Sequence, residues 1–130
     1  MNQQKKVKVL IVGAGRIAGL NETDDFRKKP CTHMGAYREH PGFEVLGVVD
    51  QNLELAQQFA QIFGLQAFQD LETALEHVKP DHVSVAVPYQ YHHDIVIICA
   101  SSNHSPKSIF CEKPIADTLK RAESMDQLCT

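Results

Sequence analysis

Three small residues near the N-terminus have the spacing of a phosphate-binding turn. Gly13, Gly15 and Ala18 match the pattern Gly-x-Gly-x-x-Gly/Ala and directly follow an apolar run at 7–12. The first glycine permits a tight bend, the second lets a pyrophosphate approach the backbone, and the small third residue lets a helix pack closely on the strand. Amide groups at a helix start also attract phosphate. The pattern predicts a dinucleotide site whose turn comprises Gly13, Ala14, Gly15, Arg16, Ile17 and Ala18.

Glycines in such a turn can also serve packing alone, so the neighbouring segments decide how informative the pattern is. Here a predicted strand precedes the turn, and we expect a helix to begin at 16–20. The charged segment 21–30 ends at a proline and is expected to form a loop or insertion. The side chain of Arg16 can either reach a phosphate or face solvent, and the sequence leaves both open.

A second candidate group is the carboxylate of Asp50, at the end of the second predicted strand. A carboxylate there can accept hydrogen bonds from both adenosine ribose hydroxyls and would repel a 2′-phosphate. The next residues, Gln51 and Asn52, offer no cation, so the sequence favours NAD over NADP. Asp50 lies 32 residues beyond Ala18, more than the usual distance of about 20; the segment 21–30 accounts for the excess if it loops out. The alternative is that Asp50 only caps the next helix.

Apolar runs and capped amphipathic segments alternate along the chain. Strands are expected at 7–12, 43–49, 67–68, 82–87 and 108–111, and helices beyond the first at 32–39, 53–63, 70–77, 91–100 and 118–128. In the helix at 53–63, the residues expected to share one apolar face are Leu55, Phe59, Ile62 and Phe63. Regular alternation of strand and helix predicts an α/β fold: a doubly wound, Rossmann-type parallel sheet with helices on both faces, in three layers.

Composition excludes several classes of protein. The 130 residues correspond to about one domain, with 13 basic and 16 acidic side chains and a net charge of −3. The chain is not basic enough to suggest nucleic acid as a partner, and no apolar run reaches the ~20 residues that cross a bilayer. The N-terminus does not have the pattern of a signal peptide. Four cysteines without a Cys-x-x-Cys pair suggest reduced thiols in a cytoplasmic protein.

The histidines are not expected to bind a metal ion. His92 and His93 are adjacent, and neighbouring residues on a helix point in different directions. The remaining five histidines are expected at the surface or at helix caps: His33, His40, His77, His82 and His104.

Three further segments make the chain resemble a known family. Glu112-Lys113-Pro114 comes directly after the fifth predicted strand, and Val87-Pro88 follows the fourth, with His92 four residues beyond the proline. The segment 33–37 reads His-Met-Gly-Ala-Tyr. With the glycine turn, these segments resemble the N-terminal domain of the Gfo/Idh/MocA oxidoreductases, the glucose–fructose oxidoreductase and inositol dehydrogenase family. The resemblance covers nearly the whole chain.

The resemblance implies NAD(P)-dependent hydride transfer to or from a sugar, cyclitol or related polyol. It implies that Lys113 is catalytic and lies beside the nicotinamide, where a cation can stabilise charge on the reacting oxygen or take part in proton transfer. Glu112 would line the nicotinamide end, and Pro114 would fix the lysine backbone, through a cis peptide. The cofactor-binding set implied at the later strand ends is Val87, Pro88, His92, Glu112 and Lys113. Tyr89 departs from the Thr-Pro-Asn sequence common in the family.

The family also has a second domain that binds substrate, supplies an acid–base partner and usually forms the oligomer interface. We therefore expect residues 1–130 to be one NAD(P)-binding domain that stops before its last strand. The substrate domain would be absent from this chain, and the full-length protein would be a homo-oligomer. The alternative is a stand-alone dinucleotide-binding module or sensor without turnover. Retention of Lys113 favours the enzyme, whereas the missing substrate domain favours the module.

Overall fold

A sheet of five parallel strands forms the centre of the computed structural model, which describes residues 5–130. The strand order is β3-β2-β1-β4-β5. The strands are β1 (Val7–Val12), β2 (Phe43–Val49), β3 (Gln66–Phe68), β4 (His82–Val85) and β5 (Ser108–Cys111). The helices are α1 (His33–Glu39), α2 (Leu53–Phe63), α3 (Leu71–Val78), α4 (His92–Ser101) and α5 (Leu119–Cys129), with short 3₁₀ helices η1 (Leu20–Thr23) and η2 (Tyr89–Tyr91). The predicted doubly wound parallel fold is confirmed.

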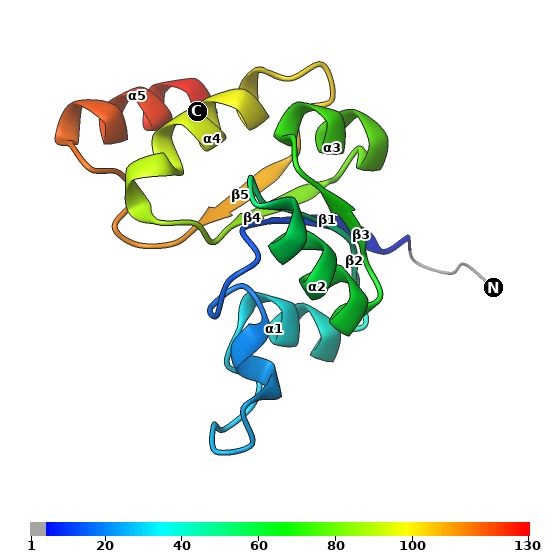
Figure 1. Cartoon of the computed structure of the whole chain (residues 1–130). Helices are drawn as coiled ribbons and strands as arrows, with labels where there is room; N and C mark the ends of the chain where they lie inside the picture. Colours follow the sequence, from blue (N-terminus) through cyan, green and yellow to red (C-terminus); the bar gives the residue numbers. More distant parts are fainter. Residues whose placement is uncertain (1–4) are drawn as a thin grey trace.

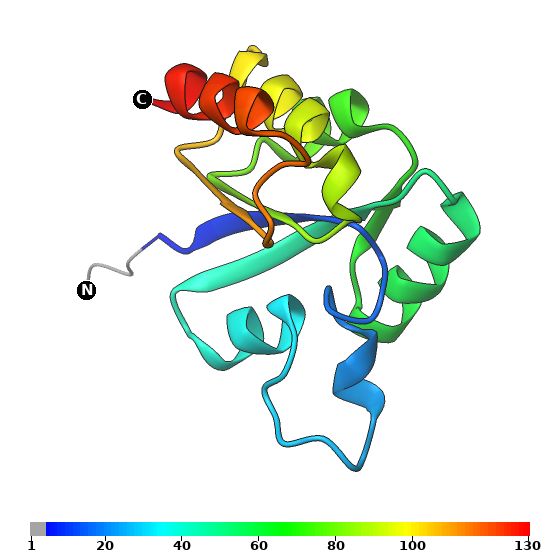
Figure 2. The ribbon, with the colours of Figure 1, turned by 90° about the vertical axis from the view of Figure 1, so that its left-hand side faces the viewer.

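The helices cover both faces of the sheet and give three layers (Figures 1 and 2). Helices α1 and α2 lie on one face, and α3, α4 and α5 lie on the other. The chain changes face between β3 and β4, so the segments that leave the neighbouring strands β1 and β4 turn to opposite sides. In open α/β sheets, this reversal of strand order creates a crevice at the carboxyl ends of the strands, where ligands bind.

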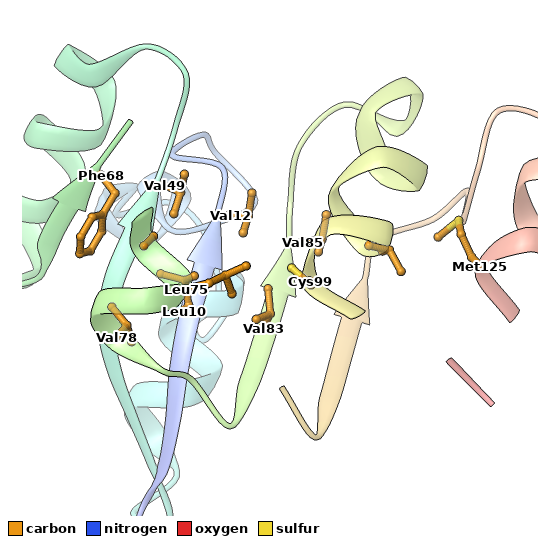
Figure 3. Close-up of a cluster of buried hydrophobic side chains, with 12 residues drawn as sticks. Leu10, Val12, Val49, Phe68, Leu75, Val78, Val83, Val85, Cys99 and Met125 are labelled. Carbon is orange, nitrogen blue, oxygen red and sulfur yellow. The ribbon is translucent and has the colours of Figure 1, made fainter. Parts of the chain in front are cut away.

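The central strand β1 is almost entirely apolar because both of its faces are covered by helices. Val9 and Ile11 pack towards α1 and α2, whereas Leu10 and Val12 pack towards α3 and α4. Successive strand residues point to opposite faces, so a strand covered on both faces must be apolar throughout. Figure 3 shows the hydrophobic cluster on the α3 and α4 side of the sheet, where Leu10 and Val12 contact side chains of neighbouring strands and helices.

The first helix differs from the sequence prediction. No α-helix begins at 16–20; the amides of Gly19 and Leu20 both donate to the carbonyl of Gly15, and the chain continues as the 3₁₀ helix η1. The segment 21–30 carries too few apolar residues to give a helix a buried face. It is instead folded back by Glu22, whose Oε1 accepts hydrogen bonds from the amides of Cys31 and Thr32.

Helix α2 has a narrower buried face than predicted. Phe59 and Phe63 are buried as expected, but Leu55 and Ile62 are exposed. Ala56 and Ala60 complete the buried stripe, since residues at spacings of three and four lie on one side of a helix. Asn52 caps α2 through a hydrogen bond from the amide of Leu55, and Gly64 ends it with a φ of 72°.

The segment Ile95–Ile98 is helical, although its β-branched residues favour a strand. It lies within α4, as predicted from the need for a crossover between two parallel strands. Strand β4 ends at Val85, two residues earlier than expected. Val87 and Pro88 therefore belong to the loop that leaves the sheet, next to the crevice.

Candidate functional site

The glycine turn is held tightly at its first glycine and is open at its second. Gly13 has a φ of 108°, and a Cβ added there would lie 2.5 Å from the carbonyl oxygen of Ala86. At Gly15, an added Cβ would meet no atom within 4 Å. Ala14 and Ala18 are buried in the hydrophobic cluster that also contains residues of α1 and α2. The turn therefore packs through Gly13, Ala14 and Ala18, whereas the backbone at Gly15 is exposed.

Asp50 joins the glycine turn to the end of β2. Its Oδ2 accepts a hydrogen bond from the amide of Ala14 at 3.0 Å, and its Oδ1 accepts one from the amide of Asn52 at 2.9 Å. The side chain of Asn52 caps α2, so Asp50 is not the cap of that helix. A carboxylate has about four lone-pair sites, so it can still accept bonds from a bound ligand.

A hollow of about 550 Å³ lies at the crevice beside these groups. Val12, Val49 and Val87 contribute apolar surface to its wall, and Asp50 and Gln51 contribute polar atoms. Pro88 and Asp70 also line it. Among the described residues that line the hollow, none is basic. A largely apolar hollow whose lining carries the carboxylates of Asp50, Asp70 and Asp94 suits an adenosine, and it offers no counter-charge to an added phosphate.

The structure places His92 behind the site rather than on its surface. The side chain is fully buried; Nε2 lies 2.9 Å from the carbonyl oxygen of Val87, and Nδ1 lies 2.9 Å from that of Pro114. Both ring nitrogens are occupied by backbone acceptors, so the expectation that His92 contacts the cofactor is corrected. His92 instead links the loop after β4 to the loop after β5.

Glu112 and Lys113 directly follow β5, at the same edge of the sheet as the glycine turn. The amide of Glu112 donates to the carbonyl of Val85, and the peptide bond between Lys113 and Pro114 is cis, as expected. The side chain of Lys113 is exposed. A hydrogen bond from His33 lowers the pKa of Glu112, and the charge of Lys113 acts in the same direction. The site therefore holds an anion and a cation side by side.

His33 and His82 are the residues that the sequence analysis missed. Neither is a surface or capping residue: His33 is buried, with Nε2 2.9 Å from Glu112 and Nδ1 2.8 Å from Ser84. His82 is half-buried and bonded through Nε2 to Tyr37. The available signal was Ser84, a hydroxyl in the middle of an apolar strand, because a buried hydroxyl requires a hydrogen-bond partner.

Residues 5–130 offer neither a metal site nor a membrane-spanning helix. These residues contain no group of three or more His, Cys, Asp or Glu side chains placed to hold a metal ion. Over the same range, none of the helices has the length and apolar character needed to cross a membrane. Burial raises the pKa of the Cys111 thiol to about 11, so the cysteine beside the Glu112–Lys113 pair is protonated at neutral pH.

The fold, the turn at Gly15 and the carboxylate of Asp50 together define a dinucleotide-binding Rossmann domain. A family model described as an oxidoreductase family with an NAD-binding Rossmann fold matches residues 7–130. The chain belongs to this family, the Gfo/Idh/MocA oxidoreductases, through its NAD-binding domain.

Relatives of this chain include named sugar and cyclitol dehydrogenases. The D-glucoside 3-dehydrogenase of Escherichia coli strain K12 is 29% identical over 120 residues, which cover 92% of this chain and 30% of that protein. The inositol 2-dehydrogenase of Rubrobacter xylanophilus is 25% identical over 122 residues, covering 93% and 31%. The WlbA dehydrogenase of Bordetella pertussis, solved with NADH and UDP-GlcNAcA, gives a TM-score of 0.80 at 25% identity, covering 96% and 34%. The chain thus spans about a third of the length of these relatives.

Proposed function

We propose that this chain is the cofactor domain of an NAD-dependent oxidoreductase that transfers hydride to or from a sugar, cyclitol or related polyol. The observation that carries the proposal is the bond between the Asp50 carboxylate and the amide of Ala14. This bond fixes a ribose acceptor directly beside the open backbone at Gly15. The names of the relatives support a sugar-like substrate. The described residues 5–130 form one domain, which corresponds to about a third of the length of these relatives.

In this proposal, different residues of the chain bind the cofactor and take part in catalysis. The backbone from Gly13 to Ala18 holds the pyrophosphate, Asp50 accepts hydrogen bonds from the ribose hydroxyls, and Val87 and Pro88 line the path to the nicotinamide. NAD, when bound, supplies the hydride acceptor. Lys113 donates a hydrogen bond to the reacting oxygen and stabilises its negative charge. Glu112 keeps an anion beside the lysine ammonium. The four cysteines are free thiols, which suits a cytoplasmic enzyme.

Titration of the chain with NADH tests the dinucleotide site directly. Binding should change the NADH fluorescence, and the change should reach saturation. The same titration with NADPH should give a weaker affinity, since the described lining of the hollow has no basic side chain. An unchanged NADH signal up to millimolar concentration would remove the basis for the proposal.

The choice between NAD and NADP is expected to depend on Asp50. Asp50→Asn keeps an acceptor oxygen but removes the charge, so NADH affinity should fall by roughly tenfold, about 1.4 kcal/mol. NADPH affinity should stay the same or improve because the repulsion of the 2′-phosphate is lost. Isothermal titration of both cofactors measures the two changes.

Asp70→Asn is the matched control for Asp50. Asp70 also lines the hollow, but its carboxylate caps α3 through Thr73 and makes no recorded bond to the glycine turn. It should leave the ratio of the two affinities unchanged. Equal losses for both cofactors in Asp50→Asn would mean that Asp50 only holds the turn together.

A further inference from the structure

A continuous chain of hydrogen bonds runs under the sheet on the side of α1. It begins at the carboxyl edge beside Lys113 and ends at the amino ends of β4 and β5. In order, it joins Glu112, His33, Ser84, Tyr37, His82 and Ser108, and we call these six residues the relay chain. They come from α1, β4 and β5 and the residue after β5, so the fold alone brings them together.

Every link of the relay chain is short. His33 Nε2 lies 2.9 Å from Glu112 Oε1, and His33 Nδ1 lies 2.8 Å from Ser84 Oγ. Ser84 Oγ lies 2.6 Å from the Tyr37 hydroxyl, which lies 2.7 Å from His82 Nε2. His82 Nδ1 lies 2.7 Å from the hydroxyl of Ser108, at the first position of β5. No water is needed to complete the connection.

Within the relay chain, His33 and Ser84 are buried, Tyr37 and His82 are half-buried, and the residues at both ends reach the surface. Ser84 is 0% exposed and His33 is 7% exposed. At one end, 28% of the Glu112 side chain is exposed, and at the other end Ser108 is an exposed residue. A network that served only to satisfy buried polar groups could have ended at Ser84. This one continues through Tyr37 and His82 to the far edge of the sheet.

The carboxylate at one end fixes the direction of every bond. Glu112 can only accept when ionised, so His33 donates through Nε2 and, when neutral, accepts at Nδ1. Ser84 must then donate to His33. By the same reasoning, Tyr37 donates to Ser84, His82 donates to Tyr37 through Nε2, and Ser108 donates to His82 Nδ1. All five protons point towards Glu112.

We propose that the relay chain carries protons between Glu112 and water at Ser108. In one passage, His33 gives its Nε2 proton to Glu112 and takes the hydroxyl proton of Ser84. Ser84 takes the proton of Tyr37, Tyr37 takes the Nε2 proton of His82, and His82 takes that of Ser108 on Nδ1. Ser108 is restored by a proton from water. Glu112 gains one proton, water loses one, and all five bonds reverse.

The surroundings keep the inner groups in the forms that this transfer requires. Burial raises the pKa of Tyr37, so its hydroxyl keeps a proton to pass on. Burial lowers the pKa of His82, which favours the neutral imidazole with one free lone pair. Glu112 has a lowered pKa and is the ionised terminus. The proton that hydride transfer releases or consumes gives the relay its use, and this use alone rests on the proposed function.

The donor order is tested by reversing the end group. Glu112→Lys replaces an acceptor by a donor, so His33 must accept at Nε2 and donate from Nδ1. The reversal should pass through Ser84 and Tyr37 and convert His82 from the Nε2–H to the Nδ1–H tautomer. Nitrogen chemical shifts of the ¹⁵N-labelled histidines at pH 7 measure both tautomers. Adding Tyr37→Phe should abolish the response of His82; an unchanged His82 tautomer in Glu112→Lys alone overturns the proposal.

Proton movement is tested by exchange of the imidazole protons with water. In the relay, the Nε2 protons of His33 and His82 exchange at the same rate, although His33 is the more deeply buried. Ser108→Ala removes the entry point and should slow the exchange at His33 at least tenfold, whereas Ser105→Ala, another exposed serine outside the relay chain, should not. The proposal is overturned if the Nε2 protons of His33 and His82 exchange at different rates, or if Ser108→Ala leaves the exchange rate at His33 unchanged. Amide spectra of each variant verify the fold, and no cofactor or turnover is needed.

Discussion

Gly15→Val is expected to abolish dinucleotide binding while leaving the domain folded. A Cβ at Gly15 meets no atom within 4 Å, and its φ lies outside the left-handed region, so the domain itself tolerates a side chain. The added isopropyl group instead occupies the space in which a pyrophosphate would approach the turn. We expect NADH affinity to fall about 100-fold or more, roughly 2.7 kcal/mol. Fluorescence titration measures the affinity, and thermal unfolding measures the stability.

Gly13→Ala is the matched comparison, because it is expected to lower the stability of the domain, whereas Gly15→Val is expected to lower the NADH affinity. Its φ of 108° is unfavourable for alanine, and the new Cβ would lie 2.5 Å from the carbonyl oxygen of Ala86. The free energy of unfolding should fall by about 2–4 kcal/mol from strain and overpacking. If Gly15→Val instead destabilised the domain and retained NADH affinity, the open face of the turn would not be the pyrophosphate site.

The glycine turn, the parallel sheet and Asp50 could be predicted because each depends on local sequence. Gly13 and Gly15 directly follow an apolar strand, and Asp50 directly follows another. Carboxyl ends of parallel strands meet at one edge of the sheet, so neighbours in space could be inferred from strand ends alone. The missing first helix shows the limit of this reasoning. The turn at 16–20 has the residues of a helix start, but the polar segment 21–30 gives it no buried face to continue.

The relay chain could not be predicted for a different physical reason. His33 is the first residue of α1 and follows the N-cap Thr32. An exposed histidine could occupy the same position, so the local sequence does not reveal that His33 is buried. Its burial depends on where α1 lies across the sheet, and hence on contacts with Ser84 and Glu112, which are distant in sequence. His92 shows the same effect, because its role follows from two backbone carbonyls in separate loops. The types of side chain were visible in the sequence, but their partners were set by packing.

Lys113→Ala is expected to reduce turnover by about 10²- to 10⁴-fold, the range for losing a group that assists proton transfer. Its side chain is exposed, and the neighbouring backbone is held by the bond between the amide of Glu112 and the carbonyl of Val85. Removing the ammonium should therefore change neither the fold nor, by more than about twofold, the NADH affinity. Steady-state kinetics with NAD and a sugar or polyol measure the turnover.

Lys107→Ala is the control for the charge alone, because Lys107 is an exposed lysine at the other end of β5. It should leave kcat unchanged. Lys113→Arg keeps a cation but has a pKa too high to release a proton. A strong loss of kcat in Lys113→Arg would assign proton transfer to the lysine, whereas a mild loss would assign it charge stabilisation only. Unchanged turnover in Lys113→Ala would refute its catalytic role.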